Sequence, residues 1–208
     1  MKSSMLSLAI LTACVLAGNT YRLETPVFIG GSDGYLSYDD GTSWWLTWDG
    51  LYRGVWFDLE DFDPLGQQFH AYYTEYWFYH HSSYPWDTSS FYAELWNGSV
   101  ISPATMLDQT SIMAVHNAPA YAYYSPGILT EYEFWCLANT SMSSGGWPSL
   151  LGDNTPHDPS HSFYSDDFII WEPWIIQGPM SNDYIVRALG SLGDLASESW
   201  GSIKGMFR

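Results

Sequence analysis

The chain has 208 residues, and its 23 Asp and Glu against 6 Lys and Arg give a formal net charge of −17. Hydrophobic residues make up 46% and aromatic residues 18%, which is enough apolar material for one folded domain and argues against a disordered acidic chain. Nucleic acids and anionic lipid surfaces are held mainly by clustered cations, so this charge excludes both as partners.

The first residues have the pattern of an export signal. Lys2 precedes an apolar run from Met5 to Leu16, and small residues around Ala17 predict cleavage there. A second interpretation takes residues 11–14 as a lipobox, in which Cys14 is lipidated after export. No later stretch reaches the roughly 18 apolar residues that a membrane-spanning helix needs. We therefore expect a secreted or cell-surface protein without a transmembrane segment.

The sequence divides into four parts: a signal peptide (1–17), an N-terminal segment (18–37), a β domain (38–190) and a C-terminal tail (191–208). Cys136 is the only cysteine after the signal, which excludes a disulfide framework and predicts a small buried side chain.

The β domain reads as short extended segments separated by Gly, Pro, Asn, Asp and Ser. Aromatic and β-branched residues dominate these segments, as half-buried pleated surfaces prefer. Without helical interludes, this spacing predicts an all-β fold, a two-sheet antiparallel β-sandwich of jelly-roll type. The expected strands are 42–48, 52–59, 69–81, 90–99, 110–116, 128–139, 161–165, 167–174 and 182–189.

Side chains of a strand alternate between its two faces, which assigns the aromatic residues. In "TSWWLTW", Trp44, Leu46 and Trp48 share one face, and we expect it to be the core. Trp45 is then outside. In 69–81, one face carries Tyr72, Thr74, Tyr76, Phe78 and His80, and the other carries Tyr73, Glu75, Trp77 and Tyr79.

Several motifs resemble a secreted bacterial β-sandwich module that recurs in extracellular peptidases and cell-surface proteins. They are "YDDG", "GVWFDL", "YTEYWFYHH", "FYAELWNG", "GWPSLLGD", "HSFYS" and "DYIVRA", between Tyr38 and Ala188. The resemblance implies a jelly-roll-like module without catalytic activity, and it implies no particular ligand. The end of the tail, "SWGSIKGMFR", resembles C-terminal export or anchoring signals of bacterial proteins.

Two stretches have the composition of metal sites. "DLEDFDP" places hard oxygen ligands at Asp58, Glu60, Asp61 and Asp63, which suits calcium; the alternative is an acidic turn. "HDPSH" places His157 and His161 in a loop where Asp153 or Asp158 could join them, or where the histidines are simply solvated. Calcium is the only cofactor that the sequence suggests.

Arg53 and Arg187 are the only cations of the β domain. Arg187, on the last expected strand, is predicted to pair with an acid at Asp39 or Asp40, because a partly buried guanidinium needs a carboxylate partner.

Twelve Trp and sixteen Tyr are too many for one core, so some must form an exposed aromatic surface. The candidate ligand-binding residues are Trp45, Trp147, Trp171 and Trp174, with the loop 140–161 beside them. The first hypothesis is a secreted non-catalytic module that binds a polysaccharide or a cell-surface protein, or serves as a structural protein. The second is a self-assembling subunit of a filament or surface layer. The third and weakest is a glycoside hydrolase, since no sequence feature nominates its pair of acids.

Overall fold

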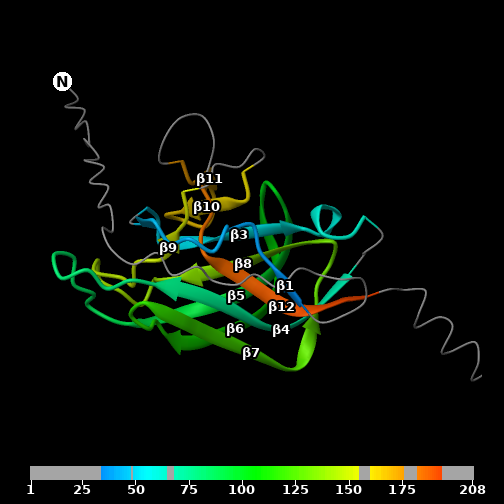
Figure 1. Ribbon diagram of the computed structural model, residues 1–208, viewed down its shortest axis with the longest axis horizontal. Helices are drawn as coiled ribbons and strands as arrows, with labels where there is room; N and C mark the ends of the chain where they lie inside the picture. Colours follow the sequence, from blue (N-terminus) through cyan, green and yellow to red (C-terminus); the bar gives the residue numbers. More distant parts are fainter. Residues whose placement is uncertain (1–33, 48, 65–67, 155–159, 176–181, 194–208) are drawn as a thin grey trace, which may run out of the picture.

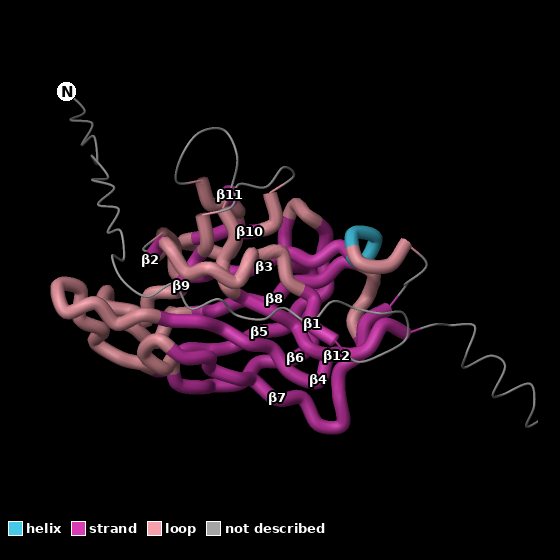
Figure 2. Tube along the Cα trace, in the orientation of Figure 1, coloured by secondary structure: helices cyan, strands magenta, loops and turns pink. Residues whose placement is uncertain are grey.

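The computed structural model describes residues 34–47, 49–64, 68–154, 160–175 and 182–193, and Figures 1 and 2 show that nearly all of their regular structure is β-strand. The expected signal peptide, most of the N-terminal segment and residues 194–208 of the tail lie outside this range. The strands are β1 (Gly34–Leu36), β2 (Trp45–Leu46), β3 (Tyr52–Asp58), β4 (Gln68–Phe78), β5 (Ser90–Ser99), β6 (Ser102–Met113), β7 (Ala118–Leu129), β8 (Glu133–Asn139), β9 (Leu151–Gly152), β10 (Ser162–Ser165), β11 (Glu172–Pro173) and β12 (Val186–Gly193). A 3-10 turn, η1 (Leu59–Asp61), follows β3.

The strands form two antiparallel sheets packed against each other, as expected for a sandwich (Figure 1). One sheet has the order β1-β12-β4-β7, the other has the order β11-β10-β3-β8-β5-β6, and β2 pairs with β9 in a separate ribbon. If β1, β3, β4, β5, β6, β7, β8 and β12 are counted one to eight, the two sheets read 1-8-3-6 and 2-7-4-5. This interleaving is the jelly-roll arrangement, to which β2 and β9–β11 are additions.

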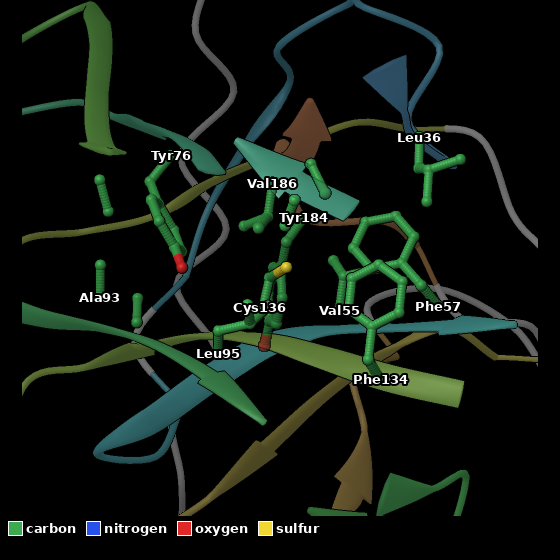
Figure 3. Close-up of a cluster of buried hydrophobic side chains, with 14 of the residues drawn as sticks. Leu36, Val55, Phe57, Tyr76, Ala93, Leu95, Phe134, Cys136, Tyr184 and Val186 are labelled. Atoms are coloured by element: carbon green, nitrogen blue, oxygen red, sulfur yellow. The ribbon is translucent and has the colours of Figure 1, made fainter. Parts of the chain in front are cut away.

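The main core lies between the sheets and consists of inward-facing apolar side chains (Figure 3). In β4, Tyr76 and Phe78 are fully buried, in agreement with the alternation expected from the sequence. Cys136 of β8 is also fully buried, and burial raises the pKa of its thiol, so it acts as a small apolar side chain.

A second cluster covers the outer face of the six-stranded sheet. Trp135 of β8 and Trp56 of β3 point away from the main core but are buried, because Phe163 and the turn carrying Phe168 and Trp171 pack over them. This extra layer hides tryptophans that a bare two-sheet sandwich would expose.

The prediction that Trp45 is exposed and Trp44 buried is wrong. Trp45 is 4% exposed and belongs to the main core, whereas Trp44 is only partly buried; Trp48 lies outside the described residues. The alternation itself is present, because Leu46 points into a different cluster. Leu46 is buried as expected, so both faces of β2 are covered. Because β2 pairs with β9 rather than with a strand of either sheet, the rule that one face of a strand is solvent-exposed does not apply to it.

Several strands differ from expectation. β6 (Ser102–Met113) begins well before the expected strand 110–116, and β11 (Glu172–Pro173) covers only a small part of the expected strand 167–174. The expected strand 128–139 is the end of β7, a turn and then β8, and most of β7 was not expected at all. Pro119 and Pro126 weaken the strand pattern of this segment, but β7 is the edge of its sheet, where prolines are tolerated. Within the part of the chain that the structure describes, no helix is long and apolar enough to cross a bilayer.

Candidate functional site

The outer face of the four-stranded sheet carries a row of aromatic side chains in cross-strand register. Tyr35 of β1 lies opposite Leu189 of β12, Leu189 lies opposite Tyr73 of β4, and Tyr73 lies opposite Tyr123 of β7. Tyr121 stands two residues before Tyr123 on the same face. We call Tyr35, Tyr73, Tyr121 and Tyr123 the tyrosine surface.

The four rings of the tyrosine surface contact one another around Tyr73. Its ring centroid lies 5.9 Å from that of Tyr35, 5.3 Å from that of Tyr121 and 5.5 Å from that of Tyr123. The hydroxyl groups of Tyr35 and Tyr73 share a hydrogen bond. Tyr123 is 68% exposed and the other three are partly buried, so the rings support each other and still leave aromatic area open to solvent.

A buried ionic network lies next to these rings in the same sheet. Arg187 donates to Asp39 through Nε at 3.0 Å from Oδ2, and its Nη1 lies 3.6 Å from Oε1 of Glu75. Glu75 also accepts a hydrogen bond from the indole nitrogen of Trp77. The three charged side chains are at most 5% exposed, so each carboxylate depends on its donors to offset desolvation.

Burial and the charges of this network shift the pKa values of the arginine and of two of the tyrosines. Burial acts to lower the pKa of Arg187, but the hydrogen bonds and charge of Asp39, together with Glu75, raise it above its ordinary value. Burial raises the pKa of Tyr35, and the hydrogen bond to Tyr73 and the charge of Glu75 act in the same direction. The pKa of Tyr121 is raised by burial and by Glu75. Tyr35 and Tyr121 therefore keep neutral hydroxyl groups at physiological pH.

No Lys or Arg side chain is exposed on the described part of the chain. Arg53 and Arg187 are the only cations between residues 34 and 193, and they are 0% and 3% exposed. Arg53 donates to the carbonyl oxygen of Thr47 and to the hydroxyl of Thr140, and burial lowers the pKa of its guanidinium to about 10. The charged groups on this surface are therefore carboxylates.

The four tryptophans predicted to bind a ligand are spread over the fold. Trp45 and Trp174 are 4% and 2% exposed, so the expectation that they offer an exposed aromatic surface is wrong. Trp147 is partly buried with its ring 5.3 Å from the guanidinium carbon of Arg53, and Trp171 packs on Trp135. All four have structural contacts, and the described strand faces expose tyrosine instead.

The four acids of "DLEDFDP" form a capped turn. Asp58 Oδ1 accepts from the backbone nitrogen of Glu60 at 2.9 Å, and Asp61 Oδ2 accepts from the hydroxyl of Tyr38 at 2.7 Å. Among the described residues, no three His, Cys, Asp or Glu side chains are placed to hold a metal ion. These contacts fit the acidic turn, and the calcium site at Asp58, Glu60, Asp61 and Asp63 stays a prediction.

The structure brings together one residue from each of the two motifs considered as metal sites. His161 Nε2 lies 3.2 Å from Asp61 Oδ2, and the imidazole stacks between Tyr38 and Trp56. His157 and Asp158 lie outside the described residues. This arrangement is an aromatic stack with one imidazole–carboxylate contact, and it joins the residue before β10 to the turn after β3.

In comparisons with known proteins, no family model, no curated protein and no solved structure matches the chain, so they indicate neither a family nor a function. The resemblance to a secreted module therefore stays a prediction.

The sequence analysis grouped Tyr73 with Glu75 and Trp77 on one face of their strand without assigning that face to the exterior, and it missed the rest of the tyrosine surface. The signal was available in "AYAYY", residues 120–124, where Ala120 and Ala122 point inward and Tyr121 and Tyr123 point outward. Tyr35 lies in the short strand β1, which the sequence analysis left in the N-terminal segment.

Proposed function

We propose that this chain is a secreted, non-catalytic binding module that recognises sugar rings through the tyrosine surface. The observation that carries the proposal is the register of Tyr35, Tyr73 and Tyr123 across the sheet, with Tyr121 beside them. Aromatic rings held by antiparallel strands give a ligand a preformed apolar area at little entropic cost, and their hydroxyl groups add hydrogen-bond donors and acceptors.

Sugars fit this surface better than the other ligands that stack on aromatic rings. Nucleobases also stack, but single-stranded nucleic acids need cations along the backbone, and the described surface exposes none. Extended peptides bind mainly at sheet edges, where backbone groups are free, whereas these tyrosines occupy the face of a sheet. The C–H faces of a pyranose ring can pack on tyrosine without any cation.

The charge of the molecule narrows the class of glycan. With a net charge of −17, carboxylated or sulfated polysaccharides are repelled. Neutral glycans, and glycans with free amino groups, are compatible with this charge. Such polymers are found outside cells, which agrees with the export signal predicted at residues 1–17.

The test is binding to soluble polysaccharides measured by calorimetry and by tryptophan emission. The panel contains neutral β-glucan, xylan, starch and hydroxyethyl cellulose, an amino glycan (chitosan) and two acidic polymers (alginate and heparin). We expect binding to at least one neutral or amino glycan and to neither acidic polymer. Trp77 donates to Glu75 next to the rings, so its emission should report the bound ligand.

Two single variants connect binding to the surface. Tyr73→Ala and Tyr123→Ala should each weaken glycan binding at least tenfold, because Tyr73 contacts the other three rings and Tyr123 is the most exposed. Tyr92→Ala is the matched control, since Tyr92 is a partly buried tyrosine on β5 of the other sheet. Binding to no polysaccharide, or equal loss in Tyr92→Ala and Tyr123→Ala, would show the proposal to be wrong.

A further inference from the structure

One side of the sandwich is nearly free of charge. Between Glu94 and Glu131, the only Asp, Glu, Lys or Arg is Asp108, although the whole chain carries 23 acids in 208 residues. This uncharged stretch contains β6 and β7 and the turns at their ends.

The same stretch holds most of the exposed apolar side chains. Of the ten large apolar side chains that are strongly exposed in the described residues, seven lie here and three lie in the turn and strand around β11. The seven are Val100, Ile101, Met106, Met113, Val115, Tyr123 and Leu129. Ile101 is 78% exposed and Met113 is 64% exposed. Exposed apolar side chains gathered on one side of a monomer mark an interaction surface.

The topology places these side chains on two edge strands and their turns, and Tyr123 among them also belongs to the tyrosine surface. β6 is the edge strand of the six-stranded sheet and β7 is the edge strand of the four-stranded sheet, and Figure 1 shows both along the lower side of the sandwich. Because β7 runs back after β6, Ile101 and Leu129 lie toward one end of this side, and Met113 and Val115 lie toward the other. We call this surface, formed by β6, β7 and their turns, the β6–β7 side.

The β6–β7 side is large enough for a stable dimer. Each of the two strands has 12 residues, which at about 3.3 Å per residue gives a length of roughly 40 Å. Two sheets stacked about 10 Å apart, with their side chains, make this side roughly 20 Å wide. The resulting area of about 800 Å² per copy is that of a standard specific interface.

We infer that the β6–β7 side is the contact between two copies of this chain. A partner of opposite charge would gain most on the carboxylate-rich surface elsewhere, not on the side that has almost no charge. A partner with the same strong negative charge can approach only where that charge is missing. A second copy meets this condition, and pairing the same surface on both copies gives a closed two-fold dimer.

The experiment is sedimentation velocity of the full chain between about 1 and 100 µM, at 50 and 500 mM NaCl. We expect a monomer–dimer equilibrium whose association strengthens with salt, because salt screens the repulsion between two acidic bodies. Ile101→Glu and Met113→Glu should each weaken dimerisation at least tenfold, because each dimer would then bury two added carboxylates.

The chain offers matched controls for both changes. Ile169 is 78% exposed and Ile170 is 63% exposed, and both lie in the turn between β10 and β11, which is not part of the β6–β7 side. Ile169→Glu and Ile170→Glu add the same charge and should leave the dimer constant within twofold. Circular dichroism must show that all four variants are folded.

Four results would overturn the inference. The first three are a monomer at every concentration, an association that weakens with salt, and an equal effect of the Ile101→Glu and Ile169→Glu changes. The fourth is an oligomer that resists all four substitutions, which would place the contact elsewhere in the chain.

Discussion

Arg187 and Asp39 lie 148 positions apart in the sequence and form a buried ion pair, with Nε 3.0 Å from Oδ2. The pair connects the segment just after β1, which carries Asp39, to β12, the last strand of the same sheet, which carries Arg187. Asp39 was one of the two acids expected to pair with Arg187; the other, Asp40, is exposed and its carboxylate accepts from the backbone nitrogen of Thr42.

Removing the cation should strongly destabilise the fold. In Arg187→Met the side chain keeps much of its length, but the buried carboxylates of Asp39 and Glu75 lose their positive partner. We expect the free energy of unfolding to fall by about 3–5 kcal/mol, the usual cost of breaking a buried pair. Urea unfolding followed by circular dichroism measures this change.

A double variant separates two effects of Arg187→Met on stability: the buried carboxylate left without a cation, and the lost packing of the arginine side chain. Asp39→Asn keeps an oxygen that can accept from the backbone nitrogen of Gly41, as Asp39 does now. Adding Asn at position 39 to Arg187→Met should therefore recover part of the lost stability, a coupling of at least 1 kcal/mol. If Arg187→Met unfolds at the same urea concentration as the parent chain, the pair does not stabilise the fold.

The sequence predicts the burial of a side chain correctly where the side chain's own strand decides it. It fails where a segment distant in the chain covers that side chain. In β4, alternation places Tyr76 in the core and Tyr73 outside, because this strand is an inner strand with one face on the core. Alternation gives the wrong answer for Trp45, since the burial of this side chain depends on β9, more than 100 residues later in the chain. Trp135 is hidden by a turn that no local pattern connects to β8. The tyrosine surface likewise could not be predicted, because it depends on the order of the strands in the sheet. The alternation of residues along one strand does not give that order.

The burial of Trp45 in β2 predicts which of the two neighbouring tryptophans matters more for stability. Trp45→Ala should cost about 3–5 kcal/mol, because it empties a fully packed position and removes the indole donor to Asn154. Trp44→Ala should cost clearly less, because Trp44 is already partly exposed. Thermal unfolding of the two variants side by side decides this, and a larger loss for Trp44→Ala would contradict the burial of Trp45.

Gly152 is required by its contact with a tryptophan. A Cβ atom on Gly152 would lie 2.2 Å from the ring of Trp174, which itself stacks on Tyr184 with centroids 4.5 Å apart. Gly152→Ala should therefore lower the free energy of unfolding by about 1–3 kcal/mol through overpacking.

Shrinking the ring tests this explanation. Phe at position 174 leaves room for the new methyl group, so Gly152→Ala should cost less in a Trp174→Phe background than in the parent chain. Equal costs in the two backgrounds, measured by urea unfolding, would mean that the ring is not the obstacle.

Asp153 should make the protein less stable as the pH rises toward neutrality. Burial raises the pKa of its carboxyl to about 7, and the charges of Asp183 and Asp40 add to this, although two backbone N–H groups oppose it. Because the folded pKa lies above the ordinary value of 3.8, the folded state binds the proton more tightly than the unfolded state. This contribution to stability is complete below about pH 4 and is lost as the pH rises to about 7, by up to about 4 kcal/mol.

Asp153→Asn should remove this slope, because an amide does not titrate. Its stability should change less than that of the parent chain between pH 5 and pH 7.5, measured by urea unfolding at each pH. Asp166→Asn is the control, since Asp166 is an exposed acid in the turn after β10 and is not among the groups that raise the pKa of Asp153. A parent chain that gains stability over this range, or an Asp153→Asn variant with the parent slope, would show that Asp153 is already ionised in the folded protein at pH 5.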